Sequence, residues 1–425
     1  MQDQIHPSPP DISQIIFLHE KLAKRKCDRF LLNLALAYHQ MGHKVVLYTS
    51  QYNRSETIDD FKFLDKIKIR YSGWWIPNSL FGIFRGKMSI LKSICLALRM
   101  VFSRQKNASN LIILDTSIIA LYILNLFTHN RLLYVESFEQ LRNQADFCEH
   151  STYSPSLLEA KFIKLADEIV VESDGFAEVF KRSFPAVAKE PVIIYPAIDI
   201  GLWNEDGIKI QRIIPDLMDN TVVFLSIGKY KRSTNFKLAL NAFEILLQLI
   251  ADIETTKCFQ LVIAGNCKTL EEKLYYQEMV STTKERKCAS QVSFLNKLPI
   301  IHEKTLIMGA AVAIHPSKSD LQADFILKAM SLGKPIVATT KGIAPQLLQN
   351  KVSGITTEPD PNAMAQVLRK LMMSPHLQSF IGDVAKEVFQ KNYSFKSFCS
   401  KLSEITFKHG IEAAPSIKTL KAKEA

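Results

Sequence analysis

Short apolar runs alternate with segments of helical periodicity through the first 200 residues of the chain. The run QIIFLH (14–19) predicts a buried strand, and CDRFLLNLALAYHQMGH (27–43) predicts a helix that ends near Gly42. The next run, KVVLYTS (44–50), predicts a second strand. A strand, a helix and a strand in this order favour a right-handed crossover and a parallel sheet. Later strand candidates in this half are KIKIRY (66–71), LIILD (111–115), RLLYVE (131–136) and DEIVVES (167–173).

The second half of the chain repeats this pattern. A helix is expected over 238–249, between the first two of six further apolar runs. These runs are TVVFLSIG (221–228), FQLVIAG (259–265), QVSFL (291–295), AAVAIHP (310–316), KPIVATT (334–340) and VSGITTE (352–358). Two successive β/α alternations predict an α/β protein with two doubly wound, Rossmann-like domains. Ligands of such sheets bind beyond the carboxyl ends of the strands, here in a cleft between the domains.

Proline and glycine interrupt the apolar runs between Tyr195 and Gly207, which places the domain boundary there. A chain of 425 residues also exceeds one ordinary core, so two domains are expected on length alone. The predicted parts are a flexible N-terminus (1–13), an N-terminal acceptor-side domain (14–200), a C-terminal donor-side domain (215–390), a C-terminal helix that crosses back to the first domain (391–408) and a basic tail (409–425).

The composition indicates a globular protein of a reducing compartment. The chain is 47% hydrophobic and 22% charged, as globular proteins are. Its seven cysteines are scattered and include no C-x-x-C pair, which indicates a reducing compartment and argues against a disulfide framework or a zinc site. The first 13 residues contain no apolar core of the kind that secretory signals have, so we expect no signal peptide.

The net charge of +11 indicates an anionic partner or a solvated excess of lysine. No nucleic-acid-binding motif is present, so nucleic acid is not an expected partner. The strongly apolar segment 80–102 carries Arg85, Lys87, Lys92 and Arg99, which interrupt any membrane span. Two interpretations stay open: a basic amphipathic helix that lies on a membrane, or a core helix whose long cations reach solvent.

Several short motifs recur in an order typical of one enzyme family. They are GWWIP (73–77), RMVF (99–102), YPAIDI (195–200), SIGKYKRSTNFKLALNAF (226–243), LVIAG (261–265), YQEM (276–279) and EPDP (358–361). In this set the chain, from about Gln14 to Phe407, resembles the alpha-1,3/1,6-mannosyltransferases of lipid-linked oligosaccharide assembly, which are family-4 glycosyltransferases with the two-domain GT-B fold.

The resemblance implies a location and a reaction. Members of that family act peripherally on the cytosolic face of the endoplasmic reticulum membrane. They transfer mannose from GDP-mannose to a dolichol-diphosphate oligosaccharide for N-glycosylation, with retention of the anomeric configuration. The resemblance therefore implies GDP-mannose as donor, no metal or other cofactor, and as partners a lipid-linked oligosaccharide or other glycosyltransferases.

The resemblance also assigns the positions that contact the donor diphosphate. An Arg and, five residues later, a Lys of the family correspond to Lys229 and Thr234 here. Lys229 keeps a positive charge but loses the bidentate geometry of arginine, and Arg232 lies close enough in sequence to substitute. The glycine-containing loop after the family's first strand corresponds to Glu20–Arg29, which contains no glycine.

The family's two donor-site carboxylates are replaced unequally. They correspond to Asp320, which keeps the charge and is the candidate catalytic carboxylate, and to Lys328, which reverses it at the ribose position. An ammonium group cannot accept the hydrogen bonds of ribose hydroxyls. A Phe-Gly pair of the family becomes Gln322-Ala323, and Asp324 follows where a helix begins. The family's histidine corresponds to Glu136, a candidate base or simply a strand-end carboxylate.

Two main functions remain open at this stage. The first is an active retaining mannosyltransferase with a substituted site, and a transferase for another donor is a weaker variant of it. The second is a catalytically inactive relative, an interaction or regulatory protein at the endoplasmic reticulum surface. The substitutions at Thr234, Lys328 and Glu136, together with the missing glycines, favour the second.

Overall fold

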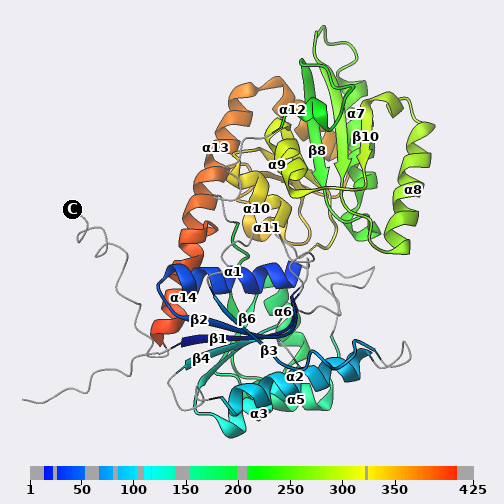
Figure 1. The fold of residues 1–425 in the computed structure, drawn as a ribbon. Coiled ribbons are helices and arrows are strands. Elements are labelled where there is room, and N and C mark those ends of the chain that lie inside the picture. Colours follow the sequence, from blue (N-terminus) through cyan, green and yellow to red (C-terminus); the bar gives the residue numbers. More distant parts are fainter. Residues whose placement is uncertain are drawn as a thin grey trace, which may run out of the picture.

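The structure is a computed structural model of the whole chain (Figure 1). It describes residues 14–22, 26–52, 67–79, 85–103, 110–115, 117–136, 138, 153–198, 208–320 and 324–408. The predicted flexible N-terminus (1–13) and basic tail (409–425) lie outside these residues, as do Gln322 and Ala323.

The first half of the chain forms a seven-stranded parallel sheet in the order β3-β2-β1-β4-β5-β6-β7. Its strands are β1 (Gln14–Leu22), β2 (Val45–Tyr52), β3 (Lys68–Tyr71), β4 (Asn110–Leu114), β5 (Arg131–Val135), β6 (Glu168–Val171) and β7 (Val192–Ile193). The central strands are buried on both faces, which explains why they appear in the sequence as continuous apolar runs. The strands predicted from these runs are confirmed.

Helices cover both faces of this sheet (Figure 1). They are α1 (Lys26–Gln40), α2 (Arg85–Val101), α3 (Ile118–Phe127), α5 (Leu157–Phe162) and α6 (Asp174–Ser183), with the short helix η3 (Ile163–Leu165) after α5. The apolar side of α1 packs on one face, and α2, α3 and α6 pack on the other. The segment LIILDTSIIALYILNLF (111–127) therefore contains the strand β4 and the helix α3, whose inner side is buried.

The second half forms a six-stranded parallel sheet in the order β10-β9-β8-β11-β12-β13. Its strands are β8 (Thr221–Ile227), β9 (Cys258–Ala264), β10 (Val292–Leu295), β11 (Val312–His315), β12 (Ile336–Thr339) and β13 (Ile355–Thr357). Counted from its own first strand, this sheet has the order 3-2-1-4-5-6 of the doubly wound dinucleotide-binding folds. The predicted architecture of two Rossmann-like domains is therefore confirmed.

The helices of the second half enclose two further cores. They are α7 (Phe236–Leu249), α8 (Leu270–Lys284), α9 (Ile300–Gly309), α10 (Asp324–Ser331), α11 (Ala344–Leu347), α12 (Pro361–Met373) and α13 (Pro375–Asn392), with the 3-10 turns η5 (Ile210–Arg212), η6 (Arg232–Thr234) and η7 (Ala289–Gln291). Pro361 and Pro375 lie in the first turns of α12 and α13, where proline costs no helical hydrogen bond.

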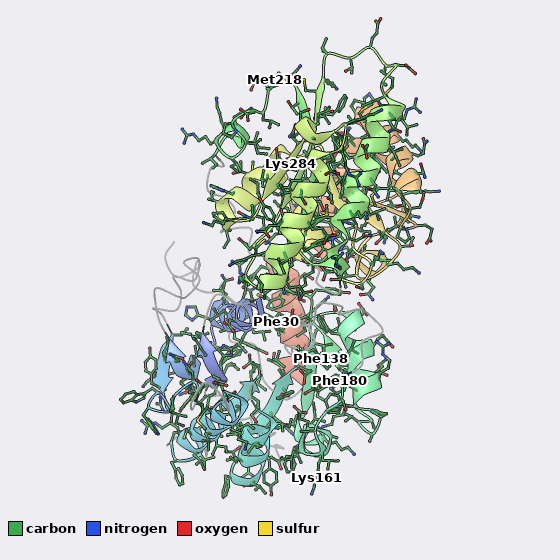
Figure 2. All side chains as sticks on the ribbon, turned by 90° about the vertical axis from the view of Figure 1, so that its right-hand side faces the viewer. Phe30, Phe138, Lys161, Phe180, Met218 and Lys284 are labelled. Carbon is green, nitrogen blue, oxygen red and sulfur yellow. The ribbon has the colours of Figure 1, made fainter. Side chains whose placement is uncertain are left out.

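The last described helix, α14 (Phe395–Lys408), joins the two halves of the chain. Figure 1 shows α13 and α14 descending along one side of the molecule from the second domain to the first. Phe398, Leu402 and Ile405 of α14 are buried in the core of the first sheet beside α1. The ring of Phe398 meets Phe30 edge-on at 6.3 Å, and Figure 2 shows Phe30 beside this helix. The two ends of the chain thus share one hydrophobic core.

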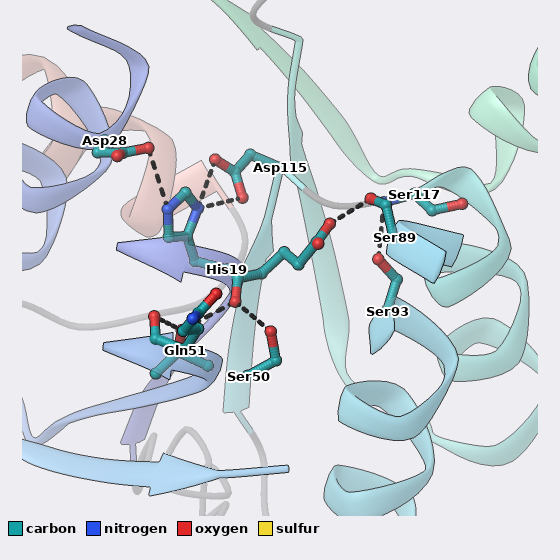
Figure 3. A network of polar contacts seen from close by, with 10 residues as sticks. His19, Asp28, Ser50, Gln51, Ser89, Ser93, Asp115 and Ser117 are labelled. Atoms are coloured by element: carbon teal, nitrogen blue, oxygen red, sulfur yellow. Dashed lines mark hydrogen bonds and ion pairs between the residues drawn. The ribbon is translucent and has the colours of Figure 1, made fainter. Parts of the chain in front are cut away.

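A buried charge cluster fixes the first turn of α1 to the carboxyl edge of the first sheet (Figure 3). His19, near the end of β1, lies between two carboxylates and is 3% exposed. Its Nδ1 is 2.8 Å from an oxygen of Asp115, after β4, and its Nε2 is 3.2 Å from Oδ1 of Asp28, in the first turn of α1. Burial alone would lower the pKa of His19, but Asp115 and then Asp28 outweigh it and raise the pKa to about 10.

Two glycines allow α13 to approach the turn after α10 unusually closely. Gly333 adopts a left-handed conformation with φ +65° at the end of α10. A Cβ on Gly382 of α13 would lie 2.1 Å from the carbonyl oxygen of Gly333. That distance is much shorter than van der Waals contact. Because the atom in the way belongs to the backbone of Gly333, a side chain at position 382 would force α13 or the turn after α10 to move.

Replacing Gly382 with alanine tests this close approach. In an ordinary helix the change stabilises by up to about 1 kcal/mol. Here we expect a loss of about 1–3 kcal/mol, because the methyl group overlaps the Gly333 carbonyl. Urea unfolding measures the difference, with the exposed Glu387→Ala on the same helix as a control expected to stay within about 0.5 kcal/mol. A Gly382→Ala variant as stable as the wild type would contradict the packing.

The His19 cluster predicts a pH dependence of stability. Since the pKa of His19 rises from 6.5 in the unfolded chain to about 10 in the folded one, its contribution is complete below pH 6.5. It is lost as the pH rises through about 10. The His19→Gln variant should therefore be less stable at pH 6, and its deficit should shrink towards pH 10. Unfolding titrations across this range give the comparison; a deficit independent of pH would show that His19 is not charged in the folded protein.

Candidate functional site

The loops that follow β8, β9 and β10 are held together by backbone contacts. A Cβ on Gly265, after β9, would lie 2.0 Å from the carbonyl oxygen of Gly228, after β8. The buried Tyr230 donates its hydroxyl to the carbonyls of Ile263 and Leu295, each at 3.0 Å. Asn266, directly after Gly265, accepts a hydrogen bond from the Leu298 amide at 2.8 Å. The carboxyl edge of the second sheet is thus rigidly built.

Asp320 lies in the loop after β11, and its backbone is fixed on two sides. Its amide donates to the Ser317 hydroxyl at 2.8 Å, and its carbonyl accepts from the Ile343 amide at 2.8 Å. Gly342 has φ +68°, and a Cβ there would lie 2.7 Å from the Asp320 carbonyl. Ser317 in turn donates to the carbonyl of Ser233 at 3.1 Å, which ties this loop to the one after β8. The backbone of Asp320 therefore has a well-defined position, and residues 321–323 beside it lie outside the described part of the chain.

The two cations assigned to the donor diphosphate follow β8. The carbonyl of Lys229 accepts a hydrogen bond from the Thr234 hydroxyl at 2.7 Å, so Thr234 serves the fold of this turn. Arg232 donates to both carboxylate oxygens of Glu278 on α8, at 2.7 and 3.4 Å. Its guanidinium also lies over the ring of Tyr275, 5.4 Å from the centroid. Arg232 is thus paired with α8, and its role at a diphosphate stays a prediction.

Lys328 is buried in α10 between two carboxylates. Its ammonium group lies 2.9 Å from Glu303 of α9 and 3.0 Å from Asp324, one turn earlier in α10, and its side chain is 4% exposed. Burial alone would lower the pKa of Lys328, but Asp324 and Glu303 raise it, so the group is charged. Glu303 was not singled out from the sequence; only its position in the fold, facing α10, distinguishes it from other surface acids.

Arg29 shows that α1 of the first domain approaches this cluster. Its charge is near enough to Lys328 to oppose the protonation of that residue. Figure 1 shows α1 lying directly below α10 and α11. Arg29 belongs to the segment Glu20–Arg29, which corresponds to the family's glycine-containing loop and of which residues 23–25 lie outside the described part. A cation of this segment is therefore close to the Lys328 cluster of the second domain.

Glu136, at the end of β5, turns back onto its own loop. Its carboxylate accepts a hydrogen bond from the Phe138 amide at 2.9 Å, and its own amide donates to the Val170 carbonyl. Phe138 has φ 47°, a left-handed conformation that the interaction with Glu136 helps to hold. Burial first, then the charge of Glu136, raise the pKa of Tyr134 well above its usual range, so that phenol stays neutral. The geometry gives Glu136 a structural role in this strand end; its role as a base stays a prediction.

The charged groups of the candidate site thus mostly neutralise one another. Lys328 pairs with Glu303 and Asp324, Arg232 pairs with Glu278, and Glu136 accepts a backbone amide. Within the described residues, no three His, Cys, Asp or Glu side chains are grouped so that they could hold a metal ion. Nor does any helix in the described part of the chain combine the length and apolar character that crossing a membrane requires.

Comparisons with known proteins agree with this architecture. Residues 221–374 match the family described as glycosyl transferases group 1. Sucrose-phosphate synthase from Thermosynechococcus elongatus superimposes with a TM-score of 0.69 at 14% identity, over 93% of this chain and 99% of that one. At this identity the likeness concerns the fold, and it confirms the GT-B arrangement.

Eight relatives by sequence carry one name. Over 408 residues the chain is 24% identical to the alpha-1,3/1,6-mannosyltransferase of Mus musculus, covering 93% of this chain and 96% of the relative. The enzyme of that name from Dictyostelium discoideum is 24% identical over 413 residues, with 93% and 98% covered. Six more proteins of this name are 22–25% identical. The resemblance seen in the motifs is confirmed: over nearly its whole length this chain is similar to the alpha-1,3/1,6-mannosyltransferases.

Proposed function

We propose that this chain is a non-catalytic relative of the mannosyltransferases, which acts as an interaction or regulatory protein on the cytosolic face of the endoplasmic reticulum membrane. Its partners would be glycosyltransferases that assemble the lipid-linked oligosaccharide. One observation carries the proposal: Lys328, which the resemblance assigns to the ribose contact, has its ammonium group buried between Glu303 and Asp324.

The chemistry of transfer from a nucleotide sugar explains the weight of this observation. The leaving diphosphate must be neutralised by cations or backbone amides, and the sugar and ribose hydroxyls must be oriented by acceptors. Lys328 offers donors where acceptors are needed, and both nearby carboxylates already hold it. If these two carboxylates bound a ligand instead of Lys328, the buried ammonium group of Lys328 would lose its partners. Leaving such a charge unpaired costs several kcal/mol.

The residues assigned to the donor diphosphate also support a non-catalytic role. Arg232 forms only a solvent-exposed ion pair with Glu278, which is weak, whereas Thr234 replaces the family's lysine and bonds the main chain. Asp324 sits in the first turn of α10, where its negative charge stabilises the helix dipole and would repel a phosphate. An arrangement of this kind favours a stable, empty carboxyl edge over a site for GDP-mannose.

The second candidate is an active mannosyltransferase that uses GDP-mannose and a dolichol-diphosphate oligosaccharide. Two observations favour it: Asp320 keeps a carboxylate in a rigid loop, and Gly228 and Gly265 keep their close approach at the edge of the sheet. In this case Lys229 would neutralise the diphosphate and Asp320 would orient the sugar. A transferase with another nucleotide-sugar donor belongs to the same class.

Donor binding separates the two candidates. For the folded chain we expect no saturable heat when GDP-mannose is added to about 1 mM, which corresponds to binding weaker than about −4 kcal/mol. We also expect no transfer to a dolichol-diphosphate oligosaccharide under conditions in which the mouse relative is active. The chain should fail to restore growth in cells that lack the family enzyme. Micromolar binding of GDP-mannose, or restored growth, would refute the non-catalytic role.

Replacing Lys328 tests whether the residue serves the fold. In Lys328→Met the carboxylate of Glu303 is left buried without its cation, so we expect a loss of about 3–5 kcal/mol in unfolding free energy. The Glu303→Gln change should restore part of this in the double variant. The exposed Lys370→Met is the matched control, expected within about 0.5 kcal/mol. A Lys328→Met variant as stable as that control would mean that Lys328 is free to serve a ligand.

A further inference from the structure

The chain passes between its two domains at two places that lie side by side. One crossing follows β7 at Tyr195–Ile198, and the other is the joint between α13 and α14 at Tyr393 and Ser394. We propose that Tyr195, Asp174 and Tyr393 form a latch at these crossings, which fixes the angle between the domains and must open before they can rotate. The inference is independent of the proposed function, because it concerns the joint between the domains and involves no ligand.

The first crossing connects two hydrophobic cores within two residues. Ala197 is buried in a core of the first sheet, and the next residue, Ile198, is buried in a core of the second. The buried side chain of Asn33 on α1 donates to the carbonyl of Ala197 at 2.8 Å, which fixes the crossing to the first domain. Pro196 restricts the backbone just before this point, since its ring holds φ at about −65°. Residues 199–207, which continue the crossing, lie outside the described part of the chain.

The second crossing is equally short. Helix α13 ends at Asn392 and α14 begins at Phe395, so that only Tyr393 and Ser394 lie between them. Ser394 pairs with Ile198 in an isolated parallel bridge, which joins the two crossings to each other. A rotation of one domain against the other must therefore change the backbone of both crossings together. Domain hinges are typically a few residues at the ends of elements, as these are.

Tyr195 reaches from the first domain to the second. Its ring packs against a core of the second domain and meets the ring of Tyr393 edge-on, with the centroids 5.3 Å apart. Its hydroxyl turns back to the first domain and donates to a carboxylate oxygen of Asp174. Burial first, and then this hydrogen bond, raise the pKa of Tyr195 far above its usual range, so the phenol keeps the proton that it donates. The second domain thus rests on a ring whose position is fixed by the first.

Asp174 is itself held firmly in the first domain. It is the first residue of α6, whose N-cap Ser173 accepts a hydrogen bond from the Phe176 amide at 3.3 Å. Phe176 and Phe180 anchor this helix in a core of the first sheet. A hydrogen bond to a carboxylate is stronger than one between neutral groups. The latch therefore joins a fixed acceptor in the first domain to a ring on which the second domain packs.

Rotation of the domains would also separate charges that face each other across the domain boundary. Figure 1 shows α1 of the first domain directly below α10 and α11 of the second. Lys328 and its two carboxylate partners together carry one net negative charge. The guanidinium of Arg29 on α1 lies near enough to act on this cluster. The latch thus holds the domains at an angle that keeps opposite charges close.

Single-molecule energy transfer between the domains tests the latch. Amino acids that carry a ketone, placed at the exposed positions Lys161 and Lys284, take up dyes without involving the seven cysteines. Figure 2 shows these two positions in different domains. We expect one narrow distance distribution for the otherwise unchanged chain. Tyr195→Phe, which removes only the hydroxyl, should raise the population at other distances about tenfold or more, as the loss of a hydrogen bond to a charged group would.

Tyr153→Phe is the matched control. The Tyr153 hydroxyl also donates to a carboxylate, that of Glu159 at 2.9 Å, but both residues belong to the first domain. This variant should leave the distribution between the domains unchanged. A second pair of dyes at Met218 and Lys284, both in the second domain, should give the same distribution in every variant.

Variants of Asp174 test whether the two groups act as one. Tyr195→Phe and Asp174→Ala remove the same hydrogen bond, so the double variant should open no further than the more open single variant. Asp174→Asn keeps an acceptor and should open less than Asp174→Ala. Circular dichroism and unfolding midpoints establish that each variant is folded.

Three results would overturn the proposal. They are an unchanged distribution in folded Tyr195→Phe, equal broadening in Tyr153→Phe, and additive opening by Tyr195→Phe and Asp174→Ala. The first would show that the hydroxyl does not hold the domains, and the other two that the variants loosen the protein in general. The measurement needs neither donor nor acceptor, so its failure leaves the donor-binding result unaffected.

Discussion

Both sheets of this protein are parallel, and a parallel sheet must be covered on both faces. This constraint determines where the helices pack and where polar side chains can gather. It forces helices onto the two faces of each sheet and leaves the carboxyl edges as the places where polar side chains can gather. It also explains why α14 returns to the first domain: Phe398, Leu402 and Ile405 complete the cover beside α1 that the N-terminal half leaves open. The chain runs back to the first domain through α13 and α14 because the first sheet needs this additional apolar cover.

At the carboxyl edges the dominant physical demand is that buried charges find partners. His19 is buried between Asp28 and Asp115 in the first domain, and Lys328 is buried between Glu303 and Asp324 in the second. Each cluster ties a helix to its sheet or to a neighbouring helix, since separating the charges would leave one of them unpaired in a low dielectric. Both edges are therefore stabilised by a buried cation that lies between two carboxylates. The effect of Arg29 on Lys328 shows that the first edge lies close to the second.

The fold was predictable from the sequence because its signals are local. Runs such as TVVFLSIG (221–228) and AAVAIHP (310–316) appear as strands wherever they are placed in a buried sheet, and their repetition gives the doubly wound architecture. Charge pairing is not local. Lys328 and Glu303 are 25 positions apart, and His19 and Asp115 are 96 apart, so the sequence identified Lys328 as a substitution without showing what it binds. The sequence also left two interpretations open for segment 80–102, because an apolar residue looks the same whether it faces the core or the surface.

A site that binds a diphosphate must keep cations without carboxylate partners while it is empty, and this lowers the stability of the protein. A sheet edge that binds no ligand can pair these cations and regain that stability. The backbone features of the donor side are still present, including the contact between Gly228 and Gly265 and the left-handed turn at Gly342. The side chains around them are mostly engaged with one another, as Lys328 and Arg232 show. The exposed Trp74 and Trp75 present the opposite case, since their hydrophobic area remains unsatisfied in solution. The second domain thus gains stability from charges that pair with one another, whereas the first domain keeps large apolar side chains in contact with water.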